Sequence, residues 1–215
     1  MKVLFVYPAY PETFWSYKYA LRFVSKKAGL PPLGLLTVAA LLPSWWEKKL
    51  IDLSAGDKLE DKDIQWADYV FIGAMSVQRK TASELIKRCK QLEATIVAGG
   101  PLFTTSPQDF EQVDYLILNE AEITLPEFLK DLKEGHPRRI YSTNKKADLN
   151  DSPIPAWELV DNLRKYNTLC FQYSRGCPFN CDFCDVTLLF GHKVRTKSVQ
   201  QLIKELDKLY QLGWR

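Results

Sequence analysis

The stretch YVFIGAMSVQRKTASELIKRCKQLEATIVAGG, residues 69–100, decides the fold of this protein. Its first six residues and its last seven are predicted to be buried strands, because both faces of such segments are apolar. A strand, a helix and a second strand in this order predict one unit of a parallel sheet. The apolar side chains of the intervening helix recur at helical spacing and share one face: Ala82, Leu85, Ile86, Cys89 and Leu92.

The same alternation continues on both sides of this unit. Prolines delimit a helix in PPLGLLTVAALL, which Pro32 opens and Pro43 closes. A later helix is predicted to begin with a capping box of Thr124 and Glu127 and to stop at Gly135. The pattern predicts a flavodoxin-like (Rossmann-like), doubly wound α/β domain over residues 1–135, with ligands at the carboxyl ends of its strands. The five strands of its parallel sheet are expected over residues 2–7, 48–53, 69–74, 94–100 and 114–118, with a short helix over 61–67.

The pattern changes after residue 135. Residues 136–167 carry polar runs and prolines with little periodicity, and we interpret them as a linker that packs on its neighbours. TLCFQYS, residues 168–174, is predicted to be a strand. A helix with a Ser198 and Gln201 capping box follows, and its expected apolar face consists of Leu202, Ile203, Leu206, Leu209 and Tyr210.

One strand–loop–helix unit cannot bury its own faces. We therefore expect residues 168–215 to be the first βα unit of a truncated TIM-type barrel, and the chain to be a piece of a longer protein. On this interpretation the piece alone is expected to be inactive and prone to aggregation.

Composition is that of an ordinary globular protein, with 46% hydrophobic and 26% charged residues and a net charge of +3. A weak basic excess does not indicate nucleic-acid binding, and HKVRTK, residues 192–197, is interpreted as a solvated loop. The apolar runs are too short for a signal peptide or a membrane span. We expect a cytoplasmic protein with reduced thiols.

Three of the five cysteines lie within eight residues of YSRGCPFNCDFCD, residues 173–185. Cys177, Cys181 and Cys184 are one ligand short of a closed tetrahedral zinc site, although His192 is a possible fourth ligand. Their x3 and x2 spacings also suit three corners of a 4Fe–4S cluster, whose fourth iron would stay open. The remaining cysteines, Cys89 and Cys170, are interpreted as packing residues.

The pattern Cys-x3-Cys-x-aromatic-Cys, with Phe183 as the aromatic residue, resembles the signature of the radical S-adenosylmethionine (SAM) enzymes. The resemblance implies that the three thiolates hold a 4Fe–4S cluster whose open iron binds SAM. It also implies reductive cleavage of SAM to a 5′-deoxyadenosyl radical, with Phe183 near the adenine. An electron donor such as flavodoxin or ferredoxin is the partner implied by this chemistry.

The whole chain resembles the cobalamin-binding class of these enzymes, in particular the methylases that act on hopanoid lipids. The likeness rests on PPLGLLTVAALLP, VAGGP, LNEAEITLPEFL, SPIPAWELVD and QYSRGCPFNCDFCD. It implies methyl transfer to an unactivated carbon of a lipid or other small molecule, with cyclisation or rearrangement as an alternative outcome. A zinc-stabilised binding module is the alternative that is not an enzyme. The expected cobalamin contacts are Ala74, Met75, Ser76, Gly99, Gly100, Pro101, Glu120 and Glu122.

The sequence departs from that class in two places. Many cobalamin domains carry Asp-x-His-x-x-Gly after the first strand, whereas YPAYPETFWSYKYALRF, residues 7–23, contains no histidine. The two histidines of the chain, His136 and His192, lie elsewhere, so we predict that the first domain supplies no histidine ligand to cobalt. Asn119 stands where relatives often carry glycine.

Overall fold

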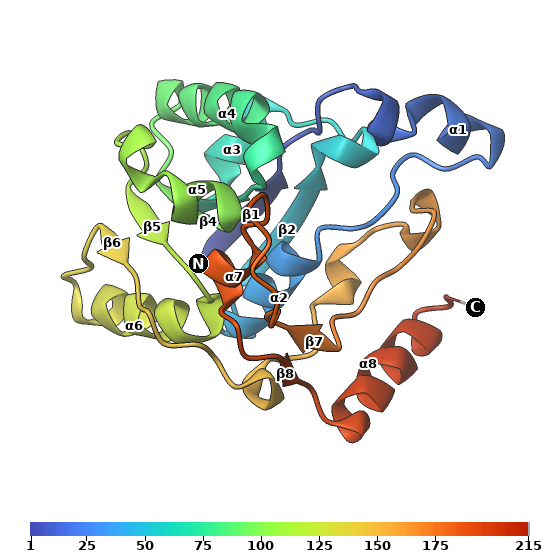
Figure 1. Ribbon diagram of the computed structural model, residues 1–215. Helices are drawn as coiled ribbons and strands as arrows, with labels where there is room; N and C mark the ends of the chain where they lie inside the picture. Colours follow the sequence, from blue (N-terminus) through green and yellow to red (C-terminus); the bar gives the residue numbers. More distant parts are fainter. Residues whose placement is uncertain (215) are drawn as a thin grey trace.

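A computed structural model of the chain describes residues 1–214. Its centre is a parallel six-stranded sheet in the order β2-β1-β3-β4-β5-β6, and a separate antiparallel ribbon joins β7 to β8 (Figure 1). The strands are β1 Lys2–Tyr7, β2 Glu47–Asp52, β3 Tyr69–Gly73, β4 Ile96–Gly99, β5 Tyr115–Ile117, β6 Ile140–Tyr141, β7 Ser174–Arg175 and β8 Arg195–Thr196.

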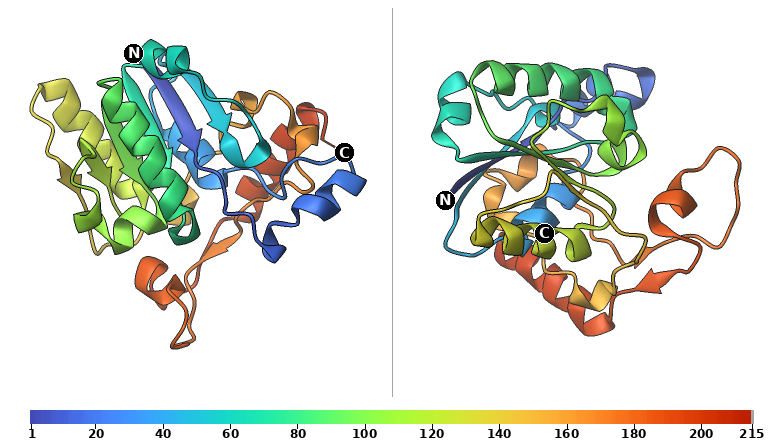
Figure 2. Two further views of the ribbon diagram at one scale, coloured as in Figure 1. Left: turned by 90° about the horizontal axis from the view of Figure 1, so that it is seen from above. Right: turned by 90° about the vertical axis from the view of Figure 1, so that its left-hand side faces the viewer.

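Helices cover both faces of the sheet. Figure 2 shows α3, α4 and α5 on one face and α2 and α6 on the other. The α-helices are α1 Lys18–Phe23, α2 Leu33–Leu41, α3 Asp61–Trp66, α4 Arg79–Gln91, α5 Pro101–Thr105, α6 Ala121–Glu134, α7 Val186–Phe190 and α8 Val199–Gln211. Short 3-10 helices span Phe14–Ser16, Leu53–Ala55, Ser76–Gln78, Pro107–Asp109, Leu149–Asp151, Trp157–Leu159 and Leu163–Lys165. Within residues 1–214, no helix combines the length and the apolar character that crossing a bilayer requires.

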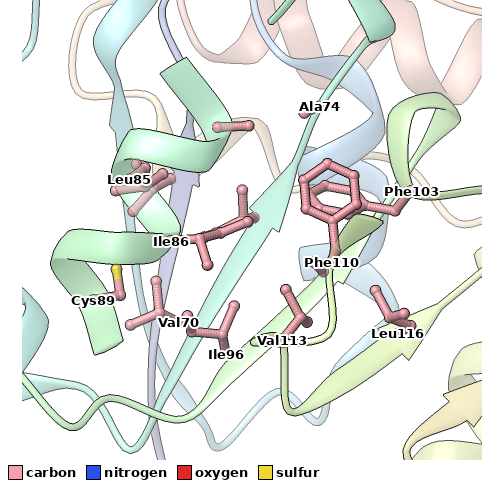
Figure 3. Close-up of a cluster of buried hydrophobic side chains, with 14 of the residues drawn as sticks. Val70, Ala74, Leu85, Ile86, Cys89, Ile96, Phe103, Phe110, Val113 and Leu116 are labelled. Atoms are coloured by element: carbon pink, nitrogen blue, oxygen red, sulfur yellow. The ribbon is translucent and has the colours of Figure 1, made fainter. Parts of the chain in front are cut away.

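The strands bury both of their faces, as the apolar runs predict. In β1, Leu4 and Val6 belong to the core beneath α3, α4 and α5, whereas Val3 and Phe5 belong to the core beneath α2 and α6. The period of two in a strand explains this division, because successive side chains point to opposite faces. Figure 3 shows the first core, in which Cys89 is fully buried.

The strand order reverses at β1. This strand pairs with β2 on one side and with β3 on the other, and both pairings are parallel. The flavodoxin-like order 2-1-3-4-5 has its switch point at the carboxyl ends of β1 and β3. The predicted doubly wound α/β fold is therefore confirmed, and the switch point marks the place to look for a ligand site.

The sheet has one strand more than the five that were predicted. β6 lies in the segment interpreted as a linker and pairs with β5 through Leu116 to Ile140 and Ile117 to Tyr141. Two residues are too few to leave a periodic pattern, so this strand could not be predicted from periodicity. The same segment supplies Trp157 and Tyr166, which are among the largest fully buried side chains.

The predicted start of α6 is wrong, whereas its end is right. The helix begins at Ala121, and Thr124 lies inside it, where its hydroxyl donates to the carbonyl oxygens of Leu118 (3.1 Å) and Glu120 (3.3 Å). A threonine in the first turn can bond backward to a carbonyl instead of capping. Gly135 ends the helix with φ +83°, the left-handed geometry that glycine adopts freely.

The strand predicted over residues 168–174 does not form. Only Ser174 belongs to a strand, and β7 pairs antiparallel with β8 rather than beginning a parallel barrel. A parallel strand needs a neighbour for its backbone groups, and within residues 1–214 no strand pairs with residues 168–173.

α8 begins at Val199, and the hydroxyl oxygen of its cap Ser198 accepts the backbone N–H of Gln201 at 3.3 Å. The reciprocal half of the predicted capping box is absent, because the Gln201 side chain donates to the carbonyl oxygens of Leu149 (3.0 Å) and Ser152 (2.6 Å). Of the positions predicted for the apolar face, Leu209 is buried and Leu202 is half-buried, whereas Ile203, Leu206 and Tyr210 are exposed.

Candidate functional site: a cavity at the sheet edge and a cysteine arm

A cavity of about 310 Å³ lies at the carboxyl edge of the sheet. This volume is at the lower end of the range for small-molecule sites. Its floor is apolar, and its rim is made by the last residue of β1 and by residues that follow β3, β4 and β5. The floor includes Leu35, Phe71, Val97, Ile117 and Leu125, and the rim includes Tyr7, Ala74, Met75, Gly100, Pro101 and Asn119.

The other wall of the cavity comes from the cysteine region. We call residues 174–196 the cysteine arm; this segment comprises β7, the cysteine loop, α7 and β8, and Figure 2 shows part of it projecting from the sheet domain. Arg175, Leu189 and Phe190 of the arm line the cavity, together with the flanking Gln172 and Lys197. Residues far apart in the sequence thus enclose one site.

The glycine pair after β4 is required by the backbone. A Cβ on Gly99 would lie 2.6 Å from the carbonyl oxygen of Ile117, closer than any real contact. Gly100 has φ +94°, which L-residues rarely adopt. The tight turn lets α5 begin at Pro101 directly at the rim. The geometry of this turn therefore explains why both positions are glycine. It also places the backbone of these two residues at the cavity.

Seven of the eight residues expected to contact cobalamin line this cavity. They are Ala74, Met75, Gly99, Gly100, Pro101, Glu120 and Glu122. The eighth, Ser76, is exposed in the short 3-10 helix Ser76–Gln78 and does not line it. Asn119 lies at the rim with φ +63°, which explains why glycine suits this position and why asparagine can replace it.

Glu120 and Glu122 do not face the cavity as free acids. The Glu120 carboxylate accepts from Arg195 at 2.7 and 2.8 Å, from Arg175 at 2.9 Å and from the amide of Ala147 at 3.2 Å. The Glu122 carboxylate accepts from Arg175 at 2.8 and 3.2 Å. Burial raises the pKa of Glu122, but the guanidinium of Arg175 more than offsets it and holds the pKa below the usual range.

Sequence reasoning missed the two arginines. HKVRTK was interpreted as a solvated loop, yet Arg195 is largely buried and Lys197 is 6% exposed. His192, Lys193, Val194 and Thr196 of this segment are exposed as expected. The ammonium of Lys197 pairs with the buried carboxylate of Glu205 in α8. Lys193, Arg195 and Lys197 recur at every second position, and this period was the available signal, but it does not identify the acidic partners.

Cys177, Cys181 and Cys184 are free thiols on one loop. The amide of Cys177 donates to the carbonyl of Gly191 at 3.1 Å, and the amide of Cys184 donates to that of Cys181 at 3.1 Å. Three thiols on one short loop match a 4Fe–4S cluster with one open iron in number and type of donor. Within residues 1–214, however, no three histidine, cysteine or acidic side chains converge as a metal site.

Phe183, the residue expected near the adenine of SAM, is 92% exposed on this loop. His192, the possible fourth zinc ligand, follows α7 in the sequence and is exposed. Neither residue is among those that line the cavity at the sheet edge. Their roles therefore stay predictions.

The other two cysteines have the environments of packing residues. Cys89 is fully buried in the core beneath α4, and burial raises the pKa of its thiol to about 11. Burial also raises the pKa of the Cys170 thiol, which is half-buried. A protonated, buried thiol is a poor ligand and a poor nucleophile.

Tyrosines occupy the end of β1, where many cobalamin domains place a histidine motif. Tyr7 lines the cavity, and its hydroxyl lies 2.8 Å from that of Tyr10. Burial raises the pKa of Tyr7, so the phenol stays protonated at neutral pH. Neither His136 nor His192 lines this cavity.

Comparison with known proteins connects this geometry to a family. Residues 23–129 match the family described as the B12 binding domain. Over its full length the chain is 45% identical to an uncharacterized methyltransferase of Synechocystis and covers 40% of that protein. It is 32% identical to the hopanoid C-2 methylase of Rhodopseudomonas palustris and covers 41% of it. The chain thus spans about two fifths of the curated relatives that it matches.

A solved structure shares the fold. The chain superposes on the radical SAM methyltransferase TsrM of Kitasatospora setae with a TM-score of 0.65 at 17% identity, covering 99% of this chain and 46% of that one. Another structure of the same protein, which contains cobalamin and a [4Fe-4S] cluster, gives a TM-score of 0.61. Residues 23–129 are therefore similar to the B12 binding domain family, and the chain is similar over its full length to a hopanoid C-2 methylase.

Proposed function

We propose that the cavity at the sheet edge binds cobalamin, and that Cys177, Cys181 and Cys184 hold a 4Fe–4S cluster for radical SAM methyl transfer. One observation carries the proposal: the rim of a B12-binding fold and the arm with the three cysteines enclose the same cavity. A reaction that uses two cofactors needs them adjacent, and Arg175, Leu189 and Phe190 of the arm that carries the three cysteines line the cavity.

Residues at the carboxyl edge of the sheet would hold cobalamin. Backbone at Gly99 and Gly100 can approach a flat macrocycle without side chains between them, and the ring of Pro101 would contact it beside them. Ala74 and Met75 would contact it from the end of β3, and the apolar floor would exclude water. Because no histidine lines the cavity, we propose that cobalt receives no histidine ligand from this domain.

The cysteine arm would hold the second cofactor. When bound, the cluster supplies the electron that cleaves SAM, and cobalamin carries the methyl group. The chain's own part is to present three thiolates on one loop and to keep that loop at the cavity. Phe183 is proposed to contact the adenine once SAM is bound, because it directly precedes the last cysteine ligand.

The relatives support a proposal for the substrate and the outcome. Two relatives act as hopanoid methylases, which supports a lipid or another small molecule with an unactivated carbon as the methyl acceptor. An electron donor such as flavodoxin or ferredoxin would reduce the cluster. Cyclisation or rearrangement is the competing outcome, and transfer of the methyl group from labelled SAM to product distinguishes methylation from both.

The test is anaerobic reconstitution followed by iron, sulfide and zinc quantification, with electron paramagnetic resonance spectra recorded with and without SAM. We expect about four irons and four sulfides per chain and a signal that SAM perturbs. A cobalamin titration monitored by visible absorption tests the cavity separately. One zinc per chain without sulfide would reject the cluster and leave a zinc-stabilised module. The Cys170→Ser variant is the control, and it should bind as much iron and sulfide as the wild type.

A further inference from the structure

Four charged side chains form a buried cluster between the sheet domain and the cysteine arm. Glu120 and Glu122 come from the start of α6, whereas Arg175 and Arg195 come from β7 and β8. The Glu120 side chain is fully buried, the Glu122 side chain is 6% exposed and the Arg175 side chain is 11% exposed. Two carboxylates face two guanidinium groups, so the cluster is neutral and its hydrogen bonds are charge-assisted.

Arg175 is the centre of this cluster. Its two terminal nitrogens reach both carboxylates, with Nη1 donating to Glu120 and Nη2 donating to Glu122. Its Nε donates to the amide oxygen of Gln172 at 3.0 Å. The side chain is thus held by three acceptors, two of which lie more than 50 residues away in the sequence.

The cluster connects directly to the cysteine loop. Arg175 precedes Cys177 by two residues, and Gly176 between them has φ +97°, a conformation that L-residues rarely adopt. The amide of Cys177 donates a hydrogen bond to the carbonyl of Gly191, so the start of the cysteine loop is attached to the C-terminal end of α7. Any displacement of Arg175 is therefore transmitted to the first cysteine.

The same arginine also lines the cavity at the sheet edge. We propose that Arg175 is a positioning residue that locks the cysteine arm onto the first turn of α6 and thereby sets the separation between the cluster and cobalamin. The part that concerns cofactors rests on the proposed function. The part that concerns docking of the arm does not, and it can be tested on the chain without cofactors.

Charge balance explains why the arm depends on this residue. Without Arg175, Glu120 would keep the guanidinium of Arg195, but the buried carboxylate of Glu122 would lose the guanidinium that pairs with it. Breaking a buried ion pair from one side leaves an uncompensated charge, which is more costly than losing both partners. The arm would then be held by the pair of Arg195 with Glu120, by the bond from Arg195 Nη2 to the carbonyl of Phe190 (2.9 Å) and by the bond from Lys146 Nζ to the carbonyl of Leu189 (2.7 Å).

Hydrogen exchange on the cofactor-free chain tests the docking. In Arg175→Gln we expect amides in residues 174–196 to exchange about tenfold faster or more, while amides of β1, β3 and β4 keep their protection. Arg138→Gln is the matched control, because Arg138 also pairs with two acids of α6, Glu127 and Asp131, but does not touch the arm.

The double variant Arg175→Gln with Glu122→Gln separates positioning from general stability. It leaves Glu120 paired with Arg195 and removes the uncompensated charge, so the chain should regain stability. A positioning role predicts that the arm still exchanges fast. If exchange of residues 174–196 returned to the wild-type rate, Arg175 would be only a structural partner and the proposal would be overturned.

The loaded chain tests the consequence for the cofactors. Reduced cluster and Co(II) cobalamin are both paramagnetic, so pulsed electron paramagnetic resonance can measure their separation. We expect one narrow distance distribution in the wild type and in Arg138→Gln, and a broadened one in Arg175→Gln at equal iron and cobalt content. Equal distributions in all three proteins would overturn the proposal.

The two proposals fail in different ways. A wild-type chain that loads neither iron nor cobalamin would reject the proposed function, and the exchange measurement would still decide whether Arg175 docks the arm. A chain that loads both cofactors but shows no effect of Arg175→Gln in either measurement would reject only the inference about Arg175.

Discussion

The hydroxyl of Tyr166 donates a hydrogen bond to Oδ2 of Asp52 at 2.7 Å, and the two residues are 114 positions apart in the sequence. Both are fully buried, and Asp52 ends β2, where its other oxygen accepts the amides of Ser54 and Ala55. Burial raises the pKa of the Asp52 carboxyl, and the bond from Tyr166 opposes that rise without cancelling it. This bond fastens the segment before the cysteine arm to the sheet.

The variant Tyr166→Phe should lower the free energy of unfolding at neutral pH by about 1–3 kcal/mol, the cost of leaving a buried acceptor without its donor. A carboxyl whose pKa is raised by folding stabilises the fold at low pH and loses that contribution as the pH rises through the raised pKa. The loss in the variant should therefore shrink as the pH falls through the pKa of Asp52. Urea denaturation at several pH values measures this, with exposed Tyr173→Phe as the control. An equal loss at every pH would contradict the assignment to Asp52.

Thiol alkylation should distinguish the five cysteines. Exposed Cys181 should react first with iodoacetamide in the cofactor-free chain, and Cys89 should react only after unfolding. With a pKa of about 11, Cys89 has a thiolate fraction on the order of 0.001 at pH 8, and burial also blocks access. Mass spectrometry of labelled peptides gives the order. Labelling of Cys89 at the rate of Cys181 in the folded chain would contradict the buried core around α4.

Loading with iron and sulfide should change that pattern selectively. Cys177, Cys181 and Cys184 should all become protected, because a thiolate bound to iron does not attack the reagent. The reactivity of Cys170 should stay as it was in the cofactor-free chain. Protection of fewer than three of these cysteines would contradict the proposed ligand set.

Gly34 offers a way to obstruct the cavity without disturbing the fold. This glycine lines the cavity from α2, and a Cβ added there would meet nothing within 4 Å. Gly34→Ala should stabilise the chain by about 0.5 kcal/mol, since alanine is the better helix former. Gly34→Trp should weaken cobalamin binding by about tenfold or more, because its ring would occupy ligand space. Unchanged affinity in Gly34→Trp, measured by absorption titration, would place cobalamin elsewhere.

The two sides of α8 should respond differently to substitution. Leu209 is 5% exposed and packs with Tyr166 and Trp157, so Leu209→Ala should lower the free energy of unfolding by about 2–5 kcal/mol. Ile203 and Leu206 are 51% and 46% exposed, so Ile203→Lys and Leu206→Lys should change stability by less than about 0.5 kcal/mol. Both lysine variants should raise the concentration at which the chain aggregates, which light scattering measures. A large loss of stability in Leu206→Lys would show that this face is covered.

Local sequence patterns determined the sheet domain. Strands with two apolar faces and helices with one apolar face require a covered parallel sheet, because no other arrangement buries these faces together. The pattern located five of the six strands and the cavity edge, with Gly99 and Gly100 at its rim. The spacing of Cys177, Cys181 and Cys184 is also a local property, so it could be recognised without a structure.

Only the tertiary structure decided which charged residues meet. Glu120 and Arg175 are 55 residues apart, and Asp52 and Tyr166 are 114 apart, so no local period relates them. Periodicity reports which face of an element is buried but not which partner satisfies a buried charge, since that depends on how the chain returns to the sheet. For this reason the sequence indicated Glu120 and Glu122 as cavity residues, and only the structure showed that both also accept hydrogen bonds from Arg175 of the cysteine arm.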